Sequence, residues 1–266
     1  LIFAPEILSL LGGDATVINV GVDYFRIVTI GFIFQSLSFT VTAALRGIGE
    51  TKIPMKNNII ANSCNVLGNT ILIYGMFGFP ALGVTGAAIS TAVSNLIAMV
   101  LNVRYILSGK SILKLDFKEK FEFRVEVMRD LVRIGIPTAL EQMALRFGVI
   151  MFLKIVSGLG NNVYAAHQIA LNVLALSYSP AQAFGITASS LMGQSLGAKD
   201  EKLAERYTKM CQRIGLTLAI MMSASIYFGA TLLAGMYTDN VEIIQNTIIA
   251  LSIVAFVQPF QSHQLI

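Results

Sequence analysis

The chain has 266 residues, of which 55% are hydrophobic and 13% carry a charged side chain, whereas roughly a quarter of the residues of soluble domains are charged. With a mean hydropathy of +0.71, this composition excludes an ordinary soluble domain and indicates a polytopic α-helical membrane protein. The net charge of +4 does not indicate nucleic-acid binding, because most basic residues lie between apolar stretches, as the positive-inside rule describes.

Both ends of the chain lie in apolar sequence, with no initiator Met and no signal-peptide pattern. We therefore expect a fragment that is cut at both ends, with residues 1–11 as the tail of a helix. Seven membrane spans are predicted after this tail, because a crossing needs about 20 apolar residues. The predicted spans are 24–45, 57–77, 83–107, 132–158, 163–192, 210–236 and 242–266.

Basic residues follow the first, third and fifth spans, and the other connections carry none. This alternation places the loops 46–56, 104–133 and 193–213 in the cytoplasm and predicts a multi-pass protein of the plasma (inner) membrane. Residues 109–130 alternate apolar and charged side chains, which fits either an amphipathic segment on the membrane surface or a solvated linker. The predicted organisation is a first set of helices in 1–108, a linker in 109–131 and a second set in 132–266.

An internal repeat relates the two sets of helices. The segment Ile33-Phe34-Gln35-Ser36 recurs in part as Pro259-Phe260-Gln261-Ser262, 226 residues later. This shift moves the first span onto the seventh, an even number of crossings away, so the two halves share one orientation in the membrane. Such parallel repeats occur in one class of secondary transporters. A six-span repeat predicts an all-α protein of twelve spans in two six-helix lobes, of which the chain covers roughly helices 3 to 10.

Two spans carry polar side chains on one helical face. In the second span, Asn58, Asn62, Asn65 and Asn69 follow the spacing i, i+4, i+7, i+11. These amides either line a polar cavity, which we favour, or hydrogen-bond to neighbouring helices. In the fifth span, Gln168 and Asn172 share a face, and Tyr178 follows two turns later. His167, beside Gln168, is either a hydrogen-bonded interhelical residue or part of a proton relay.

The fourth span carries Glu141, Gln142 and Arg146. Arg146 lies roughly 20 Å beyond the basic edge at Arg133, near the membrane midplane, where a charge is costly and usually faces a bundle interior or a wet cavity. Gln142 and Arg146 face the same way, whereas Glu141 and Arg146 point about 140° apart on an ideal helix. Glu141 is therefore either a carboxylate that exchanges protons or Na⁺, or a group bonded permanently to a neighbouring helix.

Several motifs resemble those of the multidrug and toxic compound extrusion (MATE) family. Residues 45–55 read LRGIGETKIPM and resemble the R-G-x-G-[DE]-T-x-x-P-M loop of that family, in which glycines allow a tight turn and Pro54 can open the next helix. Residues 80–88 (PALGVTGAA) resemble the entry to its sixth helix. The motifs GIP, AAHQI and GQSLGA at 135–137, 165–169 and 193–198 fit its second lobe.

The resemblance implies a twelve-helix antiporter, not an enzyme, that exports cationic or amphipathic drugs and toxins in exchange for H⁺ or Na⁺ by alternating access. It implies no cofactor or metal beyond the coupling ion. The expected partners are small organic cations and membrane lipid, and the expected state is a monomer. Two alternatives remain. One is a flippase of the same architecture for lipid-linked saccharides, and a less favoured one is a membrane-embedded enzyme.

The site residues follow from the resemblance in part. Some family members carry N-x-x-x-D in the fifth helix, where Asn69 replaces the Asp here, and an amide can ligate a cation but cannot titrate near neutral pH. Many members place an acidic residue eight positions after the seventh-helix proline, where this chain has Leu145, with Glu141 one turn earlier. The candidate coupling residues are Glu141, Asn65 and Asn69. The candidate cavity residues are Gln35, Asn62, Gln142, Arg146, Gln168, Asn172 and Tyr178, and the loop motif comprises Arg46, Gly47, Gly49 and Pro54.

Overall fold

The computed structural model describes residues 4–6, 15–113 and 124–266, and all regular structure in these ranges is helical. The chain divides into two compact units, Leu1–Glu119 and Lys120–Ile266, which are described separately below. Most of the helix tail expected in 1–11 and most of the charged linker, residues 114–123, lie outside the described residues.

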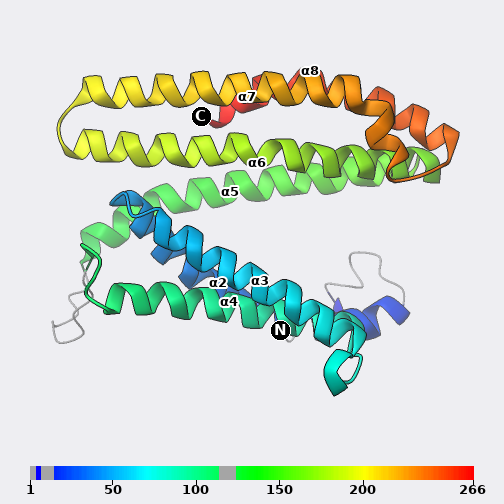
Figure 1. Cartoon of the computed structure of the whole chain (residues 1–266), viewed down its shortest axis with the longest axis horizontal. Helices are drawn as coiled ribbons and strands as arrows, with labels where there is room; N and C mark the ends of the chain where they lie inside the picture. The colour runs from blue at the N-terminus through cyan, green and yellow to red at the C-terminus, as the bar shows by residue number, and fades with distance from the viewer. Residues whose placement is uncertain (1–3, 7–14, 114–123) are drawn as a thin grey trace. The chain divides into compact units, whose positions relative to one another are not determined.

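In the described part of the first unit, residues 4–6 are helical and are followed by three long helices and one short turn of 3-10 helix (Figure 1). These are α2 (Ala15–Gly47), α3 (Lys52–Tyr74), η1 (Met76–Gly78) and α4 (Gly83–Leu107). Helix α4 packs along both α2 and α3, whereas α2 and α3 share a small contact. Gly86 permits the close approach of α3 and α4, because a Cβ atom at this position would lie 2.6 Å from the carbonyl oxygen of Leu72.

The second unit contains four helices, shown from green to red in Figure 1: α5 (Val125–Ser157), α6 (Asn161–Gly197), α7 (Glu201–Gly235) and α8 (Val241–Leu265). Helices α6, α7 and α8 all pack against one another, whereas α5 contacts α6 alone among the described helices. The three packed helices enclose an apolar core that comprises Ala170, Val173, Ile226, Ala230, Leu251 and Ala255. Every residue of α5 from Val125 to Phe152 is exposed.

A proline lies inside each of α5, α6 and α8, and neighbouring helices bond to the backbone near two of them. Pro259 has no N–H to donate to the carbonyl of Ala255 one turn earlier. That carbonyl instead accepts a hydrogen bond of 2.5 Å from the hydroxyl of Ser223 on α7. Close to Pro180, the backbone carbonyl of Ser177 accepts a bond of 2.8 Å from the buried side chain of Gln258. These bonds tie α8 to both of its neighbours.

Each of the seven predicted spans corresponds to a helix, so the predicted all-α fold is confirmed. Within residues 4–6, 15–113 and 124–266, five helical stretches are long and apolar enough to cross a membrane, and they lie in α2, α4, α6, α7 and α8. Helices α3 and α5 are not among these, because their amides and charges lower the hydropathy. Several helices are also longer than predicted. Helix α5 begins at Val125, within the predicted linker, and α7 begins at Glu201 rather than at 210. The prediction used the length of each apolar stretch, so it does not detect helical turns that continue into charged sequence.

Candidate functional site

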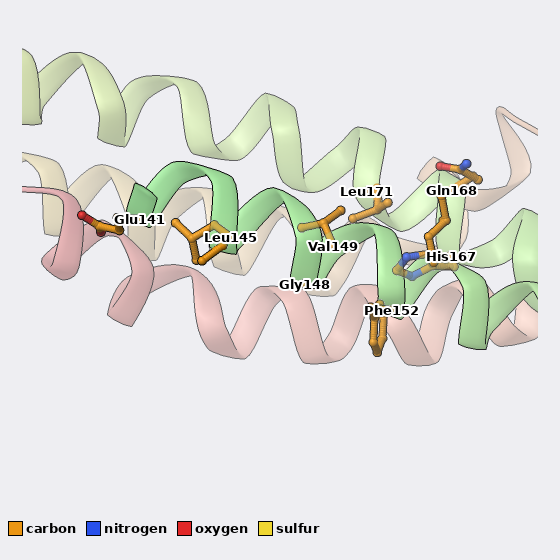
Figure 2. A pocket seen from close by; sticks show the side chains of 10 residues that line it. Glu141, Leu145, Gly148, Val149, Phe152, His167, Gln168 and Leu171 are labelled. Atoms are coloured by element: carbon orange, nitrogen blue, oxygen red, sulfur yellow. The ribbon is translucent and has the colours of Figure 1, made fainter. Parts of the chain in front are cut away.

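A pocket of about 640 Å³ lies between α5 and α6 in the second unit (Figure 2). Glu141 is at one end of the labelled side chains, and Phe152, His167 and Gln168 are at the other. Apolar side chains make up most of the wall between the two ends. The lining residues are Glu141, Ala144, Leu145, Gly148, Val149, Phe152, Leu153, His167, Gln168 and Leu171.

One face of α5 supplies most of the pocket wall. Glu141, Leu145, Gly148 and Phe152 follow the spacing i, i+4, i+7, i+11, which places these four positions on one face of the helix. At 1.5 Å per residue, Glu141 and Phe152 are about 17 Å apart along the helix axis. Gly148 leaves the middle of this face open, because a Cβ atom at this position would meet no other atom within 4 Å. The pocket is therefore long, with its carboxylate at one end.

The other end of the pocket is aromatic. The rings of Phe152 and His167 meet edge to face, with their centroids 5.4 Å apart and an interplanar angle of 64°, a preferred geometry for aromatic pairs. Beside them, the side-chain amide of Gln168 donates a hydrogen bond of 3.0 Å to the hydroxyl of Tyr164. This pairing fixes the Gln168 side chain one helical turn from Tyr164, next to the aromatic rings.

The pocket can recognise a molecule with a cationic group and an apolar body. An ionised carboxylate accepts hydrogen bonds and attracts cations, so Glu141 suits an ammonium group, a proton or Na⁺. The apolar middle removes hydrocarbon surface from water, and the ring pair at the far end offers a stacking surface. An elongated amphipathic cation meets all three requirements.

Of the predicted cavity and coupling residues, the pocket brings together Glu141 and Gln168. Gln142 and Arg146 are on α5 and Asn172 and Tyr178 are on α6, but none of the four lines this pocket. Gln35 and Asn62 belong to the first unit, on α2 and α3, where Gln35 is half-buried and Asn62 is exposed. A cavity role for these six residues stays a prediction.

In the first unit, Asn65 bonds to α4. Its side-chain amide nitrogen lies 3.4 Å from the hydroxyl of Ser90, 3.5 Å from that of Thr91 and 3.3 Å from that of Ser94. Its side-chain oxygen accepts a hydrogen bond of 3.2 Å from the amide of Asn69. The side-chain oxygen of Asn69 is buried and has no hydrogen-bond partner among the described residues. Asn65 therefore takes the interhelical role that the sequence left open, and Asn69 retains a free acceptor.

A second polar cluster was not predicted from the sequence. Asn102 on α4 is fully buried, and its side-chain oxygen accepts a hydrogen bond of 2.8 Å from the amide of Asn57 on α3. The Asn102 amide donates to the hydroxyls of Ser38 and Thr42 on α2, at 3.0 and 3.3 Å. The one signal in the sequence is the i, i+4 spacing of Ser38 and Thr42. This cluster links all three long helices of the first unit.

The motif loop joins α2 to α3. Gly47 is the last residue of α2 and Arg46 lies in its last turn. Gly49 has a φ of 88°, a conformation that favours glycine. Pro54 is buried in the first turn of α3, where its missing N–H leaves no intrahelical bond unmade. As for metals, no group of three or more His, Cys, Asp or Glu side chains that could hold an ion occurs in the described ranges.

The sequence is similar to those of proteins named as probable multidrug resistance proteins. A family model described as MatE matches residues 1–71 and 137–266. The probable multidrug resistance protein YoeA of Bacillus subtilis (strain 168) is 31% identical over 201 residues, which are 75% of this chain and 43% of that protein. The probable multidrug resistance protein NorM of Thermotoga maritima is 26% identical over 245 residues, covering 90% of this chain and 51% of that protein. The chain spans about half the length of these relatives.

Solved structures have the same fold. A crystal structure of MATE in complex with MaL6 has a TM-score of 0.85 at 20% identity, and the match covers 99% of this chain and 61% of that one. A multidrug resistance MATE family transporter of the MOP superfamily in an outward-facing conformation has a TM-score of 0.81 at 21% identity, covering 98% and 60%. The family model matches well over half of the residues. The resemblance is therefore confirmed, and the chain belongs to the MATE family of multidrug and toxic compound extrusion transporters, which are multi-pass membrane proteins.

Proposed function

We propose that the protein containing this chain exports cationic or amphipathic compounds across the plasma membrane in exchange for H⁺ or Na⁺. The observation that carries this proposal is the long apolar pocket between α5 and α6 with Glu141 at one end. The similarity to proteins named as multidrug resistance proteins supports it. We further propose that the protein acts as a monomer, with the basic loops in the cytoplasm.

Glu141 is proposed as the group that the substrate and the coupling ion share. A carboxylate can hold a proton, Na⁺ or the ammonium group of a substrate, but it cannot neutralise two of them at once. Binding of the ion on one side of the membrane then expels the substrate, and the substrate expels the ion on the other side. Exchange follows if each ligand favours a different state of the alternating-access cycle.

A secondary cation position is proposed at Asn69. Its buried side-chain oxygen lacks a partner among the described residues, and an amide oxygen can ligate Na⁺ although it cannot carry a proton. Asn65 would orient this amide, since its own oxygen accepts the hydrogen bond from Asn69. A contribution of this position therefore predicts Na⁺ dependence rather than H⁺ dependence.

The test is efflux of a fluorescent organic cation from vesicles that contain the full-length protein. A pH gradient and a Na⁺ gradient are imposed separately on wild type, on Glu141→Gln and on Glu126→Gln. Glu126 is the matched control, because it is an exposed carboxylate in the first turn of the same helix and does not line the pocket. Wild type and Glu126→Gln should respond to the same gradient, and Glu141→Gln should lose at least about tenfold in rate, as expected when a charge partner in a site is removed.

Two outcomes contradict the proposal. If Glu141→Gln responds to the gradient as wild type does, Glu141 is not the coupling group. If wild type moves no cation under either gradient, cation export is wrong, and a lipid-linked saccharide becomes the better substrate class. Arg146, near the membrane midplane on the same helix, would then be the first residue to test, because a cationic side chain suits a phosphorylated headgroup.

A further inference from the structure

The segment that follows α4 is attached to the motif loop by one carboxylate. Glu50, in the loop between α2 and α3, accepts a hydrogen bond of 2.9 Å from the hydroxyl of Ser111 through its Oε2 atom. Its Oε1 atom accepts a second bond of 3.4 Å from the backbone N–H of Ile112. Glu50 therefore joins two parts of the first unit that are 61 residues apart in sequence.

Both partners are held in place by their own backbone. The N–H of Glu50 donates to the carbonyl of Leu45 at 2.9 Å, so the residue is fixed at the turn that ends α2. After α4, Gly109 turns the chain with a φ of 70°. Ser111 is 3% exposed, and its hydroxyl accepts a further bond of 3.2 Å from the N–H of Leu113. A polar side chain this buried is costly unless it is bonded, and Glu50 supplies the acceptor for its proton.

Glu50 is chemically suited to this contact. Each oxygen of an ionised carboxylate accepts a bond, and bonds to a charged acceptor are stronger than bonds between neutral groups. Glutamine in its place would offer one acceptor oxygen and an NH₂ group facing two donors. Alanine would remove both bonds. The contact therefore predicts a graded response, in which Glu50→Gln loses part of the attachment and Glu50→Ala loses all of it.

The attachment fixes where the connection between the two units begins. Residues 108–113 follow the end of α4 at Leu107. Ser108 and Gly109 are bonded to the end of α4 by their own N–H groups, so a release by Glu50 would add residues 110–113 to the connection to α5. Its maximal reach would then grow by about 14 Å at 3.3–3.6 Å per residue. A longer tether lowers the effective concentration of one unit at the other. Relative motion of the two units would then be transmitted less directly through the chain.

We propose that Glu50 is a positioning residue that anchors the start of the inter-unit connection to the motif loop, and that this anchor sets the rate of the transport cycle. The second part of this inference rests on the proposed function, because it concerns turnover. Glu50 lies outside the pocket between α5 and α6. Loss of the anchor should therefore lower kcat and leave the KM for the exported cation unchanged, as in the many enzymes whose kcat is set by a conformational step.

The first test measures the anchor directly in the full-length protein. A nitroxide label is placed at Ile112→Cys, in a background from which the native cysteines have been replaced. The Ile112 side chain is 77% exposed and tolerates the label. The rotational mobility of the label should rise about twofold or more in Glu50→Ala and in Ser111→Ala, and less in Glu50→Gln. Side chains and loops move on the nanosecond timescale when they are not held by contacts, so the mobility of the label reports whether this segment is attached. Ser111→Thr keeps the hydroxyl and should restore the wild-type mobility.

The second test measures the transport kinetics of the same variants. In Glu50→Ala, kcat should fall about three- to tenfold at constant KM, if the anchor limits a conformational step. Glu201→Ala is the control, because Glu201 is an exposed carboxylate at the start of α7 in the other unit. Unchanged label mobility in Glu50→Ala overturns the proposal, and so does a change in KM instead of kcat. A wild type that moves no cation contradicts cation export, while label mobility still decides whether Glu50 is the anchor.

Discussion

Replacing Asn102 by alanine should destabilise the first unit by about 3–5 kcal/mol. The change removes three hydrogen bonds, one from Asn57 and two to the hydroxyls of Ser38 and Thr42. Bonds between membrane helices contribute on average about 0.6 kcal/mol each and at most about 1.7, which gives roughly 2 kcal/mol for the cluster. The two hydroxyls can turn to their own helix backbone, as Thr40 does. The buried Asn57 amide donates its hydrogen bond to Asn102, and leaving it unpaired adds about 1–3 kcal/mol.

The assay is reversible unfolding of the purified full-length protein in mixed micelles, measured for wild type and three variants. Asn102→Leu restores side-chain volume without the polar groups, so it should remain destabilised if the hydrogen bonds matter. Asn62→Ala is the control, because Asn62 is exposed on α3, and it should change the free energy of unfolding by less than about 0.5 kcal/mol. Full recovery in Asn102→Leu, or equal losses in Asn102→Ala and Asn62→Ala, would refute this reasoning.

Three further predictions concern helix packing and the pocket. Gly86→Ala should destabilise the protein in the same unfolding assay, because the new Cβ would lie 2.6 Å from the carbonyl oxygen of Leu72 on α3. Gly229→Ala is the control, because a Cβ at that position would contact no neighbouring element within 4 Å. It should be neutral or stabilising. Ser223→Ala should lower the free energy of unfolding by about 1 kcal/mol. It should lower it far less when Pro259 is also replaced by alanine, because the new N–H can donate to the Ala255 carbonyl that Ser223 bonds in wild type. Additive losses in the two single variants and the double variant would contradict this. Phe152→Ala should weaken binding of aromatic cations about fivefold, from a ring contact worth about 1 kcal/mol, with little effect on aliphatic cations in an equilibrium titration.

The positions of the helices followed from the sequence because apolar length is a local property. Each predicted span corresponds to a helix, and the turn residues of the motif loop, such as Gly49 and Pro54, lie where tight turns and helix starts occur. The residues at which the helices begin and end were predicted less accurately. Charged segments such as the start of α7 remain helical, and hydropathy does not report this.

The partners of the polar residues could not be predicted because they depend on which helices meet. Asn65 shares a helical face with Asn58, Asn62 and Asn69 in the sequence, and a cavity or a neighbouring helix would suit that face equally well. The contact with the small hydroxyl residues of α4 decides between them for Asn65. For the same reason, the sequence singled out Glu141 and Gln168 separately. That one pocket holds both follows from the packing of α5 on α6.

The central claim is that one carboxylate, Glu141, serves both the exported cation and the coupling ion. The most direct measurement is equilibrium binding of a fluorescent organic cation to the purified full-length protein, titrated against Na⁺ and, separately, against H⁺. In wild type, one of the two ions should weaken cation binding competitively, and in Glu141→Gln binding should be weak and insensitive to both ions. Binding of the organic cation that is unaffected by either ion in wild type, or that stays competitive in Glu141→Gln, would contradict the account.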